Sequence, residues 1–135
     1  MGRIIAIANQ KGGVGKTTTA IILSATVAEA GEKVLAVDFD PQGNETSGLG
    51  LEKEKIQNTV YEMLVGECDI ESCLVKEIQK NLDLLPSNVN LAGAEIELLE
   101  IRNKEKLLKN YLEKVKDQYD FITIDCPPSL SLLTI

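Results

Sequence analysis

Histidine and tryptophan are absent from the 135-residue sequence, and cysteine occurs three times. Without histidine, we expect no zinc site of the His/Cys kind. The cysteines, Cys68, Cys73 and Cys126, are odd in number and form no C-x-x-C pair, which argues against a disulfide framework. No apolar run approaches the roughly 20 residues that cross a bilayer, and the opening apolar run ends too early for a signal peptide. We therefore expect a cytoplasmic protein.

The remaining composition is typical of one globular domain. Hydrophobic residues make up 44% of the chain and charged residues 26%, so a chain of this length can bury a core. The formal net charge of -7 argues against binding of nucleic acid or an anionic membrane by bulk electrostatics. Any such partner must be engaged by local residues, or by residues absent from this chain.

Apolar strands alternate with helical segments along the sequence. Short runs that are apolar on both faces predict buried parallel strands over residues 3–8, 33–38, 81–85 and 121–125. Helical spacing predicts helices over residues 16–30, 59–65 and 91–119, with Gly31 as a left-handed cap of the first. Residues 70–78 fit neither pattern. The alternation predicts an α/β protein with a mostly parallel twisted sheet, helices on both faces, and ligands at the carboxyl ends of the strands.

The segment after the first predicted strand has the composition of a phosphate-binding loop. Its glycines let backbone N–H groups turn toward phosphates, Lys16 can reach the outer phosphates, and the Thr17 hydroxyl can bind Mg²⁺. Gln10 stands where the strict pattern has glycine, and Lys11 is an additional lysine at the mouth of the loop. The predicted phosphate-binding segment comprises Lys11, Gly12, Gly13, Val14, Gly15, Lys16, Thr17 and Thr18.

Acidic residues follow two of the predicted strands. Asp125 ends the last one, and an aspartate beside a phosphate loop is placed to hold Mg²⁺, usually through water. Asp38 ends the second strand and Asp40 follows it, at a place where a carboxylate can orient the water that attacks a terminal phosphate. Asp38 lies one step behind Asp40 and is interpreted as support for the loop or the metal shell, or as purely structural.

These residues resemble the ParA/MinD group of deviant Walker ATPases, whose mark is KGGxGKT with an extra lysine. Within that group, the segments VDFDPQGN at 37–44, TSGLG at 46–50 and DCPPS at 125–129 look like the ParA/Soj branch, which partitions chromosomes and plasmids. The segments SN at 87–88 and LAGAE at 91–95 also look like that branch. The resemblance runs from about Arg3 to the last residue.

The resemblance implies a P-loop ATPase of the deviant Walker fold that uses ATP and Mg²⁺. Its catalytic residues would be Lys11, Lys16 and Asp40, and its metal ligands Thr17 and Asp125. Lys11 would reach the phosphates of the partner in an ATP-bound homodimer, and Asp40 would assist hydrolysis. ParA-type proteins are substantially longer than 135 residues, so we expect residues 1–135 to be one incomplete P-loop ATPase domain, the amino-terminal part of a longer protein.

The same resemblance implies partners. A ParB-type centromere-binding protein would stimulate the ATPase, and DNA would be bound without sequence preference through residues absent from this chain. No membrane partner is expected, and the full-length protein would be cytoplasmic and associated with the nucleoid.

Three other functions stay open on the sequence. A ParA-like ATPase can position another cargo, such as a chemoreceptor cluster or a carbon-fixing compartment. A P-loop phosphotransferase or ligase that acts on a small molecule, like dethiobiotin synthetase, shares the loop and the fold but does not need Lys11 or the PQGN segment. The chain could also be a non-catalytic interaction module with a vestigial loop.

Overall fold

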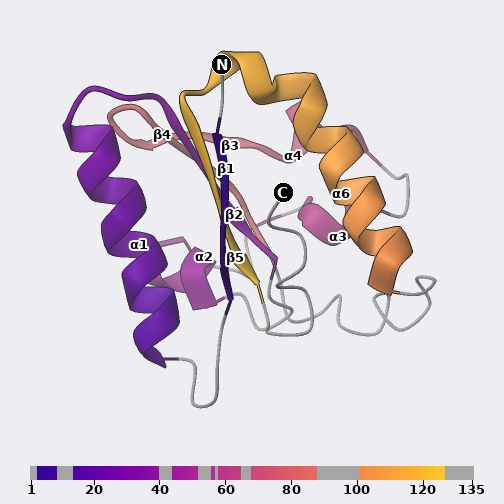
Figure 1. The fold of residues 1–135 in the computed structure, drawn as a ribbon, viewed down its shortest axis with the longest axis horizontal. Helices are drawn as coiled ribbons and strands as arrows, with labels where there is room; N and C mark the ends of the chain where they lie inside the picture. The colour runs from indigo at the N-terminus through magenta and orange to yellow at the C-terminus, as the bar shows by residue number, and fades with distance from the viewer. Residues whose placement is uncertain are drawn as a thin grey trace.

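One mixed sheet forms the centre of the molecule (Figure 1). The structure is a computed structural model that describes residues 3–8, 14–39, 44–51, 56, 58–64, 68–87 and 101–126. Within these residues the sheet has five strands in the order β1-β5-β2-β4-β3. Their bounds are β1 Arg3–Ala8, β2 Val34–Asp38, β3 Val75–Gln79, β4 Leu82–Leu85 and β5 Phe121–Cys126. All neighbours pair in parallel except β3 and β4, which are antiparallel.

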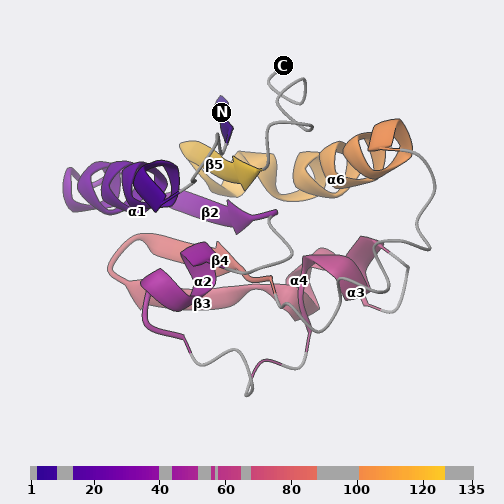
Figure 2. The ribbon, with the colours of Figure 1, turned by 90° about the horizontal axis from the view of Figure 1, so that it is seen from below.

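Helices cover both faces of this sheet, as predicted. Viewed from below, α1 and α6 lie on opposite sides of the strands (Figure 2). In the described part of the chain no helix has the length and apolar character of a membrane span. The helical elements are α1 Val14–Glu29, α2 Asn44–Gly48, α3 Val60–Leu64, α4 Ile70–Cys73, α6 Ile101–Val115 and the 3-10 turn η3 Lys116–Gln118.

Strand β2 is buried at every position because a helix packs on each of its faces. Leu35 and Val37 lie in one core cluster with residues of α6 such as Leu108. Val34 and Ala36, which alternate with them, lie in a second cluster with Ala28 of α1. Side chains alternate between the faces of a strand, so a strand with a helix on each side must be apolar throughout.

The carboxyl end of α1 is fixed by a glycine cap. Gly31 has φ +97, a left-handed conformation that glycine adopts at little cost. Its N–H donates to the carbonyl of Ala28 at 3.0 Å, which binds one of the terminal carbonyls of the helix. The cap predicted from the sequence is therefore confirmed. The chain then enters β2 at Val34, whose N–H donates to the carbonyl of Asn81 at 2.8 Å.

The predicted number of strands needs correction. The four predicted strands are one fewer than the five of the described sheet, because the ambiguous stretch at 70–78 holds α4 and all of β3 except its last residue, Gln79. Strand β3 lacks a regular alternation because its pairing with β4 is irregular, and Glu77 has φ 48. The N–H of Glu77 donates to Asp83 Oδ1 at 2.7 Å, which holds this irregular backbone in place.

The helix predicted over 91–119 is shorter at its carboxyl end. Helix α6 ends at Val115, and the chain continues as η3 before Tyr119 takes an extended conformation. Tyr119 leaves the helix because its hydroxyl donates to Asp83 Oδ2 at 2.6 Å, across to β4. The part of this prediction that covers residues 91–100 lies outside the described residues.

A buried hydrogen bond joins α1 to the centre of the sheet. Ser24 Oγ of α1 lies 2.7 Å from Thr123 Oγ1 of β5, and both residues are almost fully buried. A buried hydroxyl that loses its partner retains the cost of its desolvation. This pair therefore links the position of α1 to β5 more specifically than apolar packing alone.

Replacing one hydroxyl of this pair should destabilise the fold more than replacing both. We expect Thr123→Val to lower the free energy of unfolding by about 1–3 kcal/mol, because Ser24 is then left without this partner. The double variant Ser24→Ala/Thr123→Val should recover part of that loss, since both polar groups are gone. Urea unfolding followed by circular dichroism measures both. The pair is not coupled if the double variant loses as much free energy of unfolding as Ser24→Ala and Thr123→Val lose when their separate losses are added.

Candidate functional site

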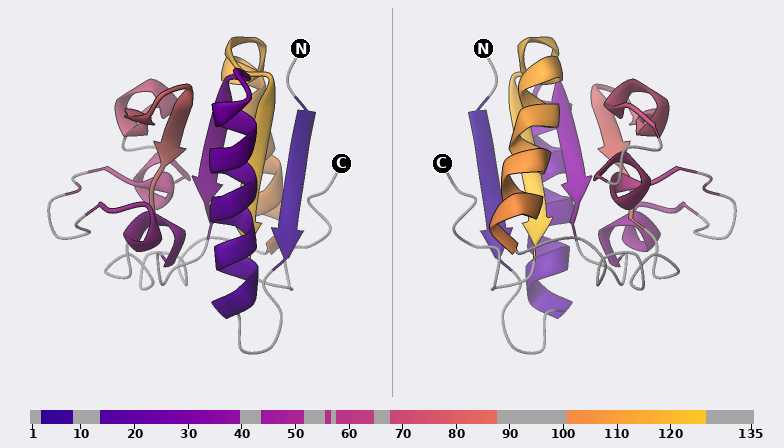
Figure 3. Two further views of the ribbon diagram at one scale, coloured as in Figure 1. Left: turned by 90° about the vertical axis from the view of Figure 1, so that its left-hand side faces the viewer. Right: turned by 90° about the vertical axis from the view of Figure 1, so that its right-hand side faces the viewer.

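The ends of three parallel strands meet at one edge of the sheet. In the register of the sheet, Ala8 of β1 is the neighbour of Cys126 of β5, and Asp38 of β2 is the neighbour of Asp125 of β5. Figure 3 shows the arrowheads of these strands and the first turn of α1 at the same end of the molecule. Segments that are far apart in the sequence, and that carry the predicted site residues, therefore converge at the carboxyl edge.

Asp38 and Asp125 are fully buried and lie side by side in the sheet. Val34 and Ala36 pack toward α1, so Asp38, two positions further along β2, is on the same face. Thr123 contacts Ser24 of α1, so Asp125, two positions further along β5, is on that face as well. Both carboxylates thus belong to the face of the sheet that α1 covers.

Asp38 connects the end of β2 to helix α2. Its Oδ2 accepts hydrogen bonds from the backbone N–H of Thr46 at 2.8 Å and from the Thr46 hydroxyl at 2.7 Å. The same hydroxyl oxygen accepts the N–H of Ser87 at 3.0 Å. Asp38, Thr46 and Ser87 are fully buried, so α2 and the chain after β4 are held to the carboxyl edge through one carboxylate.

Sequence reasoning did not assign a role to Thr46. The Thr46 hydroxyl contacts the N–H of Ser87, which is 41 positions away in the sequence, so no local spacing predicts this contact. Its position after the acidic segment is the signal that could have drawn attention to it. Helix α2 packs so closely on α1 that a Cβ at Gly48 would collide with the side chain of Ile21.

The amino-terminal end of α1 lies at the same edge. The first turn of α1 contains no acidic residue, and the first N–H groups of a helix, together with its dipole, favour anions. Of the predicted phosphate-loop residues, Val14, Gly15, Lys16, Thr17 and Thr18 are described as the backbone of this first part of α1. Lys11, Gly12, Gly13 and Asp40 lie outside the described residues.

The donor groups at this edge fit a magnesium ion beside a polyphosphate. Mg²⁺ prefers oxygen ligands, and a buried carboxylate such as Asp125 could supply them directly or through water. Two buried acids on neighbouring strands place negative charge together, and a divalent cation or hydrogen-bond donors must stabilise that charge. The helix end supplies the complementary positive potential for phosphate oxygens. The carboxyl edge therefore has the chemistry of a metal–nucleotide site.

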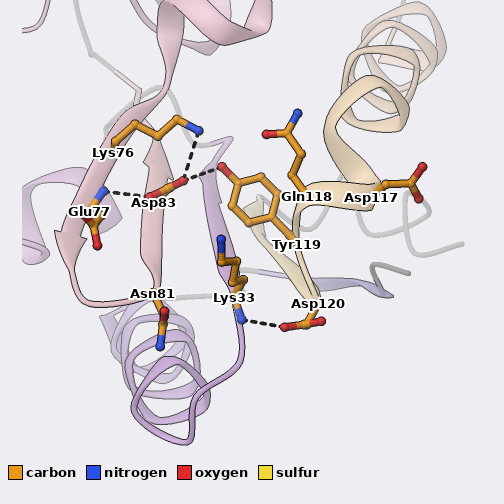
Figure 4. Close-up of a pocket in the computed structure, with 9 residues that line it drawn as sticks. All are labelled: Lys33, Lys76, Glu77, Asn81, Asp83, Asp117, Gln118, Tyr119 and Asp120. Carbon is orange, nitrogen blue, oxygen red and sulfur yellow. Dashed lines mark hydrogen bonds and ion pairs between the residues drawn. The ribbon is translucent and has the colours of Figure 1, made fainter.

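A cavity of about 720 Å³ lies at the opposite, amino edge of the sheet (Figure 4). At its centre Asp83 Oδ2 accepts the hydroxyl of Tyr119 at 2.6 Å and lies 3.5 Å from Lys76 Nζ. Burial and the hydrogen bond to Asp83 raise the pKa of Tyr119. At its rim the N–H of Lys33 donates to Asp120 Oδ2 at 2.8 Å. The contact between Asp83 and Tyr119 ties the β3–β4 hairpin to the chain between η3 and β5. Asp38 and Asp125, whose side chains the structure describes, do not line the cavity.

The comparisons with known proteins agree with this geometry. A family model described as an AAA domain matches residues 2–135. The chain belongs to the AAA domain family. Over 135 residues the chain is 56% identical to the sporulation initiation inhibitor protein Soj of Bacillus subtilis. Over the same length it is 52% identical to the chromosome-partitioning ATPase Soj of Treponema pallidum.

Both matches cover 100% of this chain, but only 53% of the Bacillus subtilis protein and 52% of the Treponema pallidum protein. The chain thus spans about half the length of the curated relatives it matches. The expected resemblance to ParA/Soj-type proteins is confirmed by these identities.

A solved structure supports the same fold. Cobyrinic acid a,c-diamide synthase from Mycobacterium smegmatis, solved with a bound ATP analogue and magnesium, matches with a TM-score of 0.86 and 42% identity. The match covers 99% of the AAA domain chain and 55% of the synthase. The predicted α/β fold of the P-loop ATPases is therefore confirmed. The ATP analogue and the magnesium bound to this relative correspond to the two cofactors predicted from the sequence.

Thr46 should be required for the packing of α2 at the carboxyl edge. We expect Thr46→Val to lower the free energy of unfolding by about 1–3 kcal/mol, because Asp38 loses a donor and Ser87 loses an acceptor. Thr46→Ser keeps the hydroxyl and removes one methyl group, and should cost about 1 kcal/mol or less. Urea unfolding of the two variants side by side makes the comparison. Equal losses in both would show that the hydroxyl is not the stabilising group.

Proposed function

We propose that this chain carries the nucleotide-binding part of a ParA/Soj-type partitioning ATPase. The observation that supports this most directly is the pairing of Asp38 with Asp125 at the carboxyl edge, on the α1 face of the sheet. This arrangement places carboxylates next to the start of a helix that favours anions. The 56% identity to Soj over the whole chain supports the partitioning branch.

In this proposal the residues from Lys11 to Thr18 form the phosphate loop. Backbone N–H groups of the loop and of the start of α1 hold the phosphate oxygens, and Lys16 neutralises their charge. Thr17 and Asp125 hold the magnesium ion, Asp125 through a water molecule. When bound, Mg²⁺ neutralises the charge on the β- and γ-phosphates. Asp125 is suited to its role because both strands beside it fix its position in the sheet.

Two further residues would make hydrolysis depend on dimerisation. Lys11 of each subunit neutralises the phosphates bound to the other subunit, so the ATP-bound dimer has a complete site and the monomer does not. Asp40 orients the attacking water, as a carboxylate after the strand next to the Asp125 strand can do. Loss of the γ-phosphate removes the charge that Lys11 binds, and the dimer then separates.

The partners follow from the same assignment. A ParB-type centromere-binding protein would stimulate hydrolysis, and DNA would be bound by residues outside this chain. The net charge of -7 supports that division, because non-specific DNA binding requires clustered Lys and Arg side chains.

A small-molecule ligase is the second candidate function. It is supported by the 42% identity and the TM-score of 0.86 to the diamide synthase. The higher identity to Soj, together with Lys11 and the PQGN segment, favours partitioning. A partitioning ATPase hydrolyses ATP without a small-molecule acceptor, whereas a ligase requires the acceptor for turnover. A ParA-like ATPase that positions another cargo would pass the same test and differ in its partner.

Lys16 should be required for nucleotide binding by the intact gene product. At an ATP concentration of about 100 times Kd, binding stabilises the folded state by about 2.7 kcal/mol, which raises the melting temperature. We expect Lys16→Ala to abolish this ATP-dependent rise in the presence of Mg²⁺. Lys33→Ala is a matched control, because Lys33 is exposed at the opposite edge of the sheet. An unchanged shift in Lys16→Ala would contradict the phosphate-loop assignment.

Lys11 and Asp40 should separate binding from dimerisation and turnover. We expect Asp40→Ala to bind ATP, to form a long-lived dimer and to turn over about 10²–10⁴-fold more slowly, because the water is no longer oriented.

Lys11→Ala should bind ATP as a monomer. Light scattering after size exclusion, with and without ATP, measures dimerisation, and phosphate release measures turnover. Parental turnover in Asp40→Ala, or an ATP-dependent dimer in Lys11→Ala, would exclude the corresponding role.

A further inference from the structure

Two cysteine thiols are in contact beside the short helix α4. Cys68 Sγ lies 2.6 Å from Cys73 Sγ. Both cysteines are free thiols in the structure. Cys73 is buried at the carboxyl end of α4, and Cys68, before the helix begins, is partly buried against the same core cluster. Neither cysteine is among the residues of the proposed nucleotide site.

Backbone hydrogen bonds hold the two thiols in contact. Asp69, the N-cap of α4, accepts the N–H of Ser72 with its side chain at 3.0 Å. At the other end, the N–H of Leu74 donates to the carbonyl of Ile70 at 3.2 Å. The turn between the cysteines is therefore fixed by groups other than sulfur. A disulfide bond joins sulfur atoms at about 2.05 Å, so a small approach of the two side chains is sufficient.

We propose that Cys68 and Cys73 form a reversible intrachain disulfide, and that this pair is a site of oxidation by hydroperoxides. Such a site differs from the structural disulfide framework that the composition argues against, because its thiols are free in the reduced protein and its bond is broken again by thiol reductants.

The environment of the two thiols assigns their roles. Cys68 is the more exposed of the two and reacts with the peroxide, giving a sulfenic acid and an alcohol, or water in the case of hydrogen peroxide. Cys73 then attacks the Cys68 sulfur. The new S–S bond replaces the S–O bond, and the departing hydroxide takes the proton of the Cys73 thiol to form water. Burial, followed by the contact with Cys68, raises the pKa of Cys73, which keeps that thiol protonated and unreactive until Cys68 is oxidised.

Reduction closes the cycle with balanced electrons. Two thiol groups of a small-molecule reductant supply the two electrons and two protons, and they leave as a disulfide. The protein returns to the two free thiols seen in the structure. The oxidised and reduced states therefore differ by two hydrogen atoms and by one covalent link across α4.

Peptide mapping of the intact gene product tests the proposal. The protein is treated with hydrogen peroxide, free thiols are blocked with iodoacetamide, and trypsin releases residues 56–76 as one peptide. We expect this peptide to be lighter by about 2 Da, the mass of two hydrogens, than the same peptide with two free thiols, and to carry no iodoacetamide. Cleavage after Glu71 should leave the two cysteine-containing pieces joined, and prior reduction with dithiothreitol should separate them.

Three variants separate this pair from other thiol chemistry. Cys73→Ser should leave the oxidised Cys68 as a sulfenic acid that dimedone traps, because the resolving thiol is gone. Cys68→Ser should leave Cys73 unoxidised at the same peroxide dose. Cys126→Ser is the matched control and should form the same link as the parental protein. The proposal is overturned if both cysteines of the parental peptide take up iodoacetamide, if Cys68 forms its link to Cys126 or to a second chain, or if Cys126→Ser abolishes the link.

Discussion

The parallel pairing of β5 with both β1 and β2 is the constraint on which the rest of the structure depends. Because β5 lies between the other two strands, the ends of all three meet at one edge, with Asp38 and Asp125 in register. A slip of one residue would turn Asp125 from the face covered by α1 to the face covered by α6, and would also turn Ile122 and Ile124 out of their core. The apolar core therefore fixes the position of the acid, since both depend on the same register.

A buried edge of this kind is stable only if its polar groups have partners. Asp38 accepts two hydrogen bonds from Thr46, and the Thr46 hydroxyl also accepts the N–H of Ser87. Each of these bonds contributes modestly, but leaving any of the groups without a partner costs about 1–3 kcal/mol. The network thus does two things with one carboxylate. It joins α2 and the end of β4 to the sheet, and it keeps negative charge next to the start of α1.

The sequence predicts well those elements whose pattern reflects burial on both faces. Strands β2 and β5 are mostly apolar on both faces because α1 and α6 cover opposite sides. Gly31 marks the end of α1 because glycine readily adopts the left-handed conformation of a helix cap. Strand β3 has no such pattern, because its irregular pairing at Glu77 depends on the distant Asp83. The contact between Asp38 and Thr46 likewise depends on the packing of α2 against the end of β2. For the site, the motifs name Lys11, Gly12, Gly13 and Asp40, which stay predictions, while the strand ends that the structure describes bring Asp38 and Asp125 together.

Both edges of the sheet carry buried or partly buried acids, and the direction of the strands decides which edge is the site. At the amino edge, Asp83 is bound by Tyr119, by Lys76 and by the N–H of Glu77, so its charge is offset within the protein. The cavity there is spacious, but its lining includes Lys33, Asn81 and Asp120, which precede β2, β4 and β5 at the strand ends opposite to the carboxyl edge. At the carboxyl edge, α1 begins beside the acids. Its first N–H groups have no partner within the helix and add a potential that attracts phosphate, while the carboxylates attract a metal ion. A helix that follows a parallel strand necessarily starts at that edge, so the chemistry of the site follows from the topology of the sheet and not from the size of a cavity.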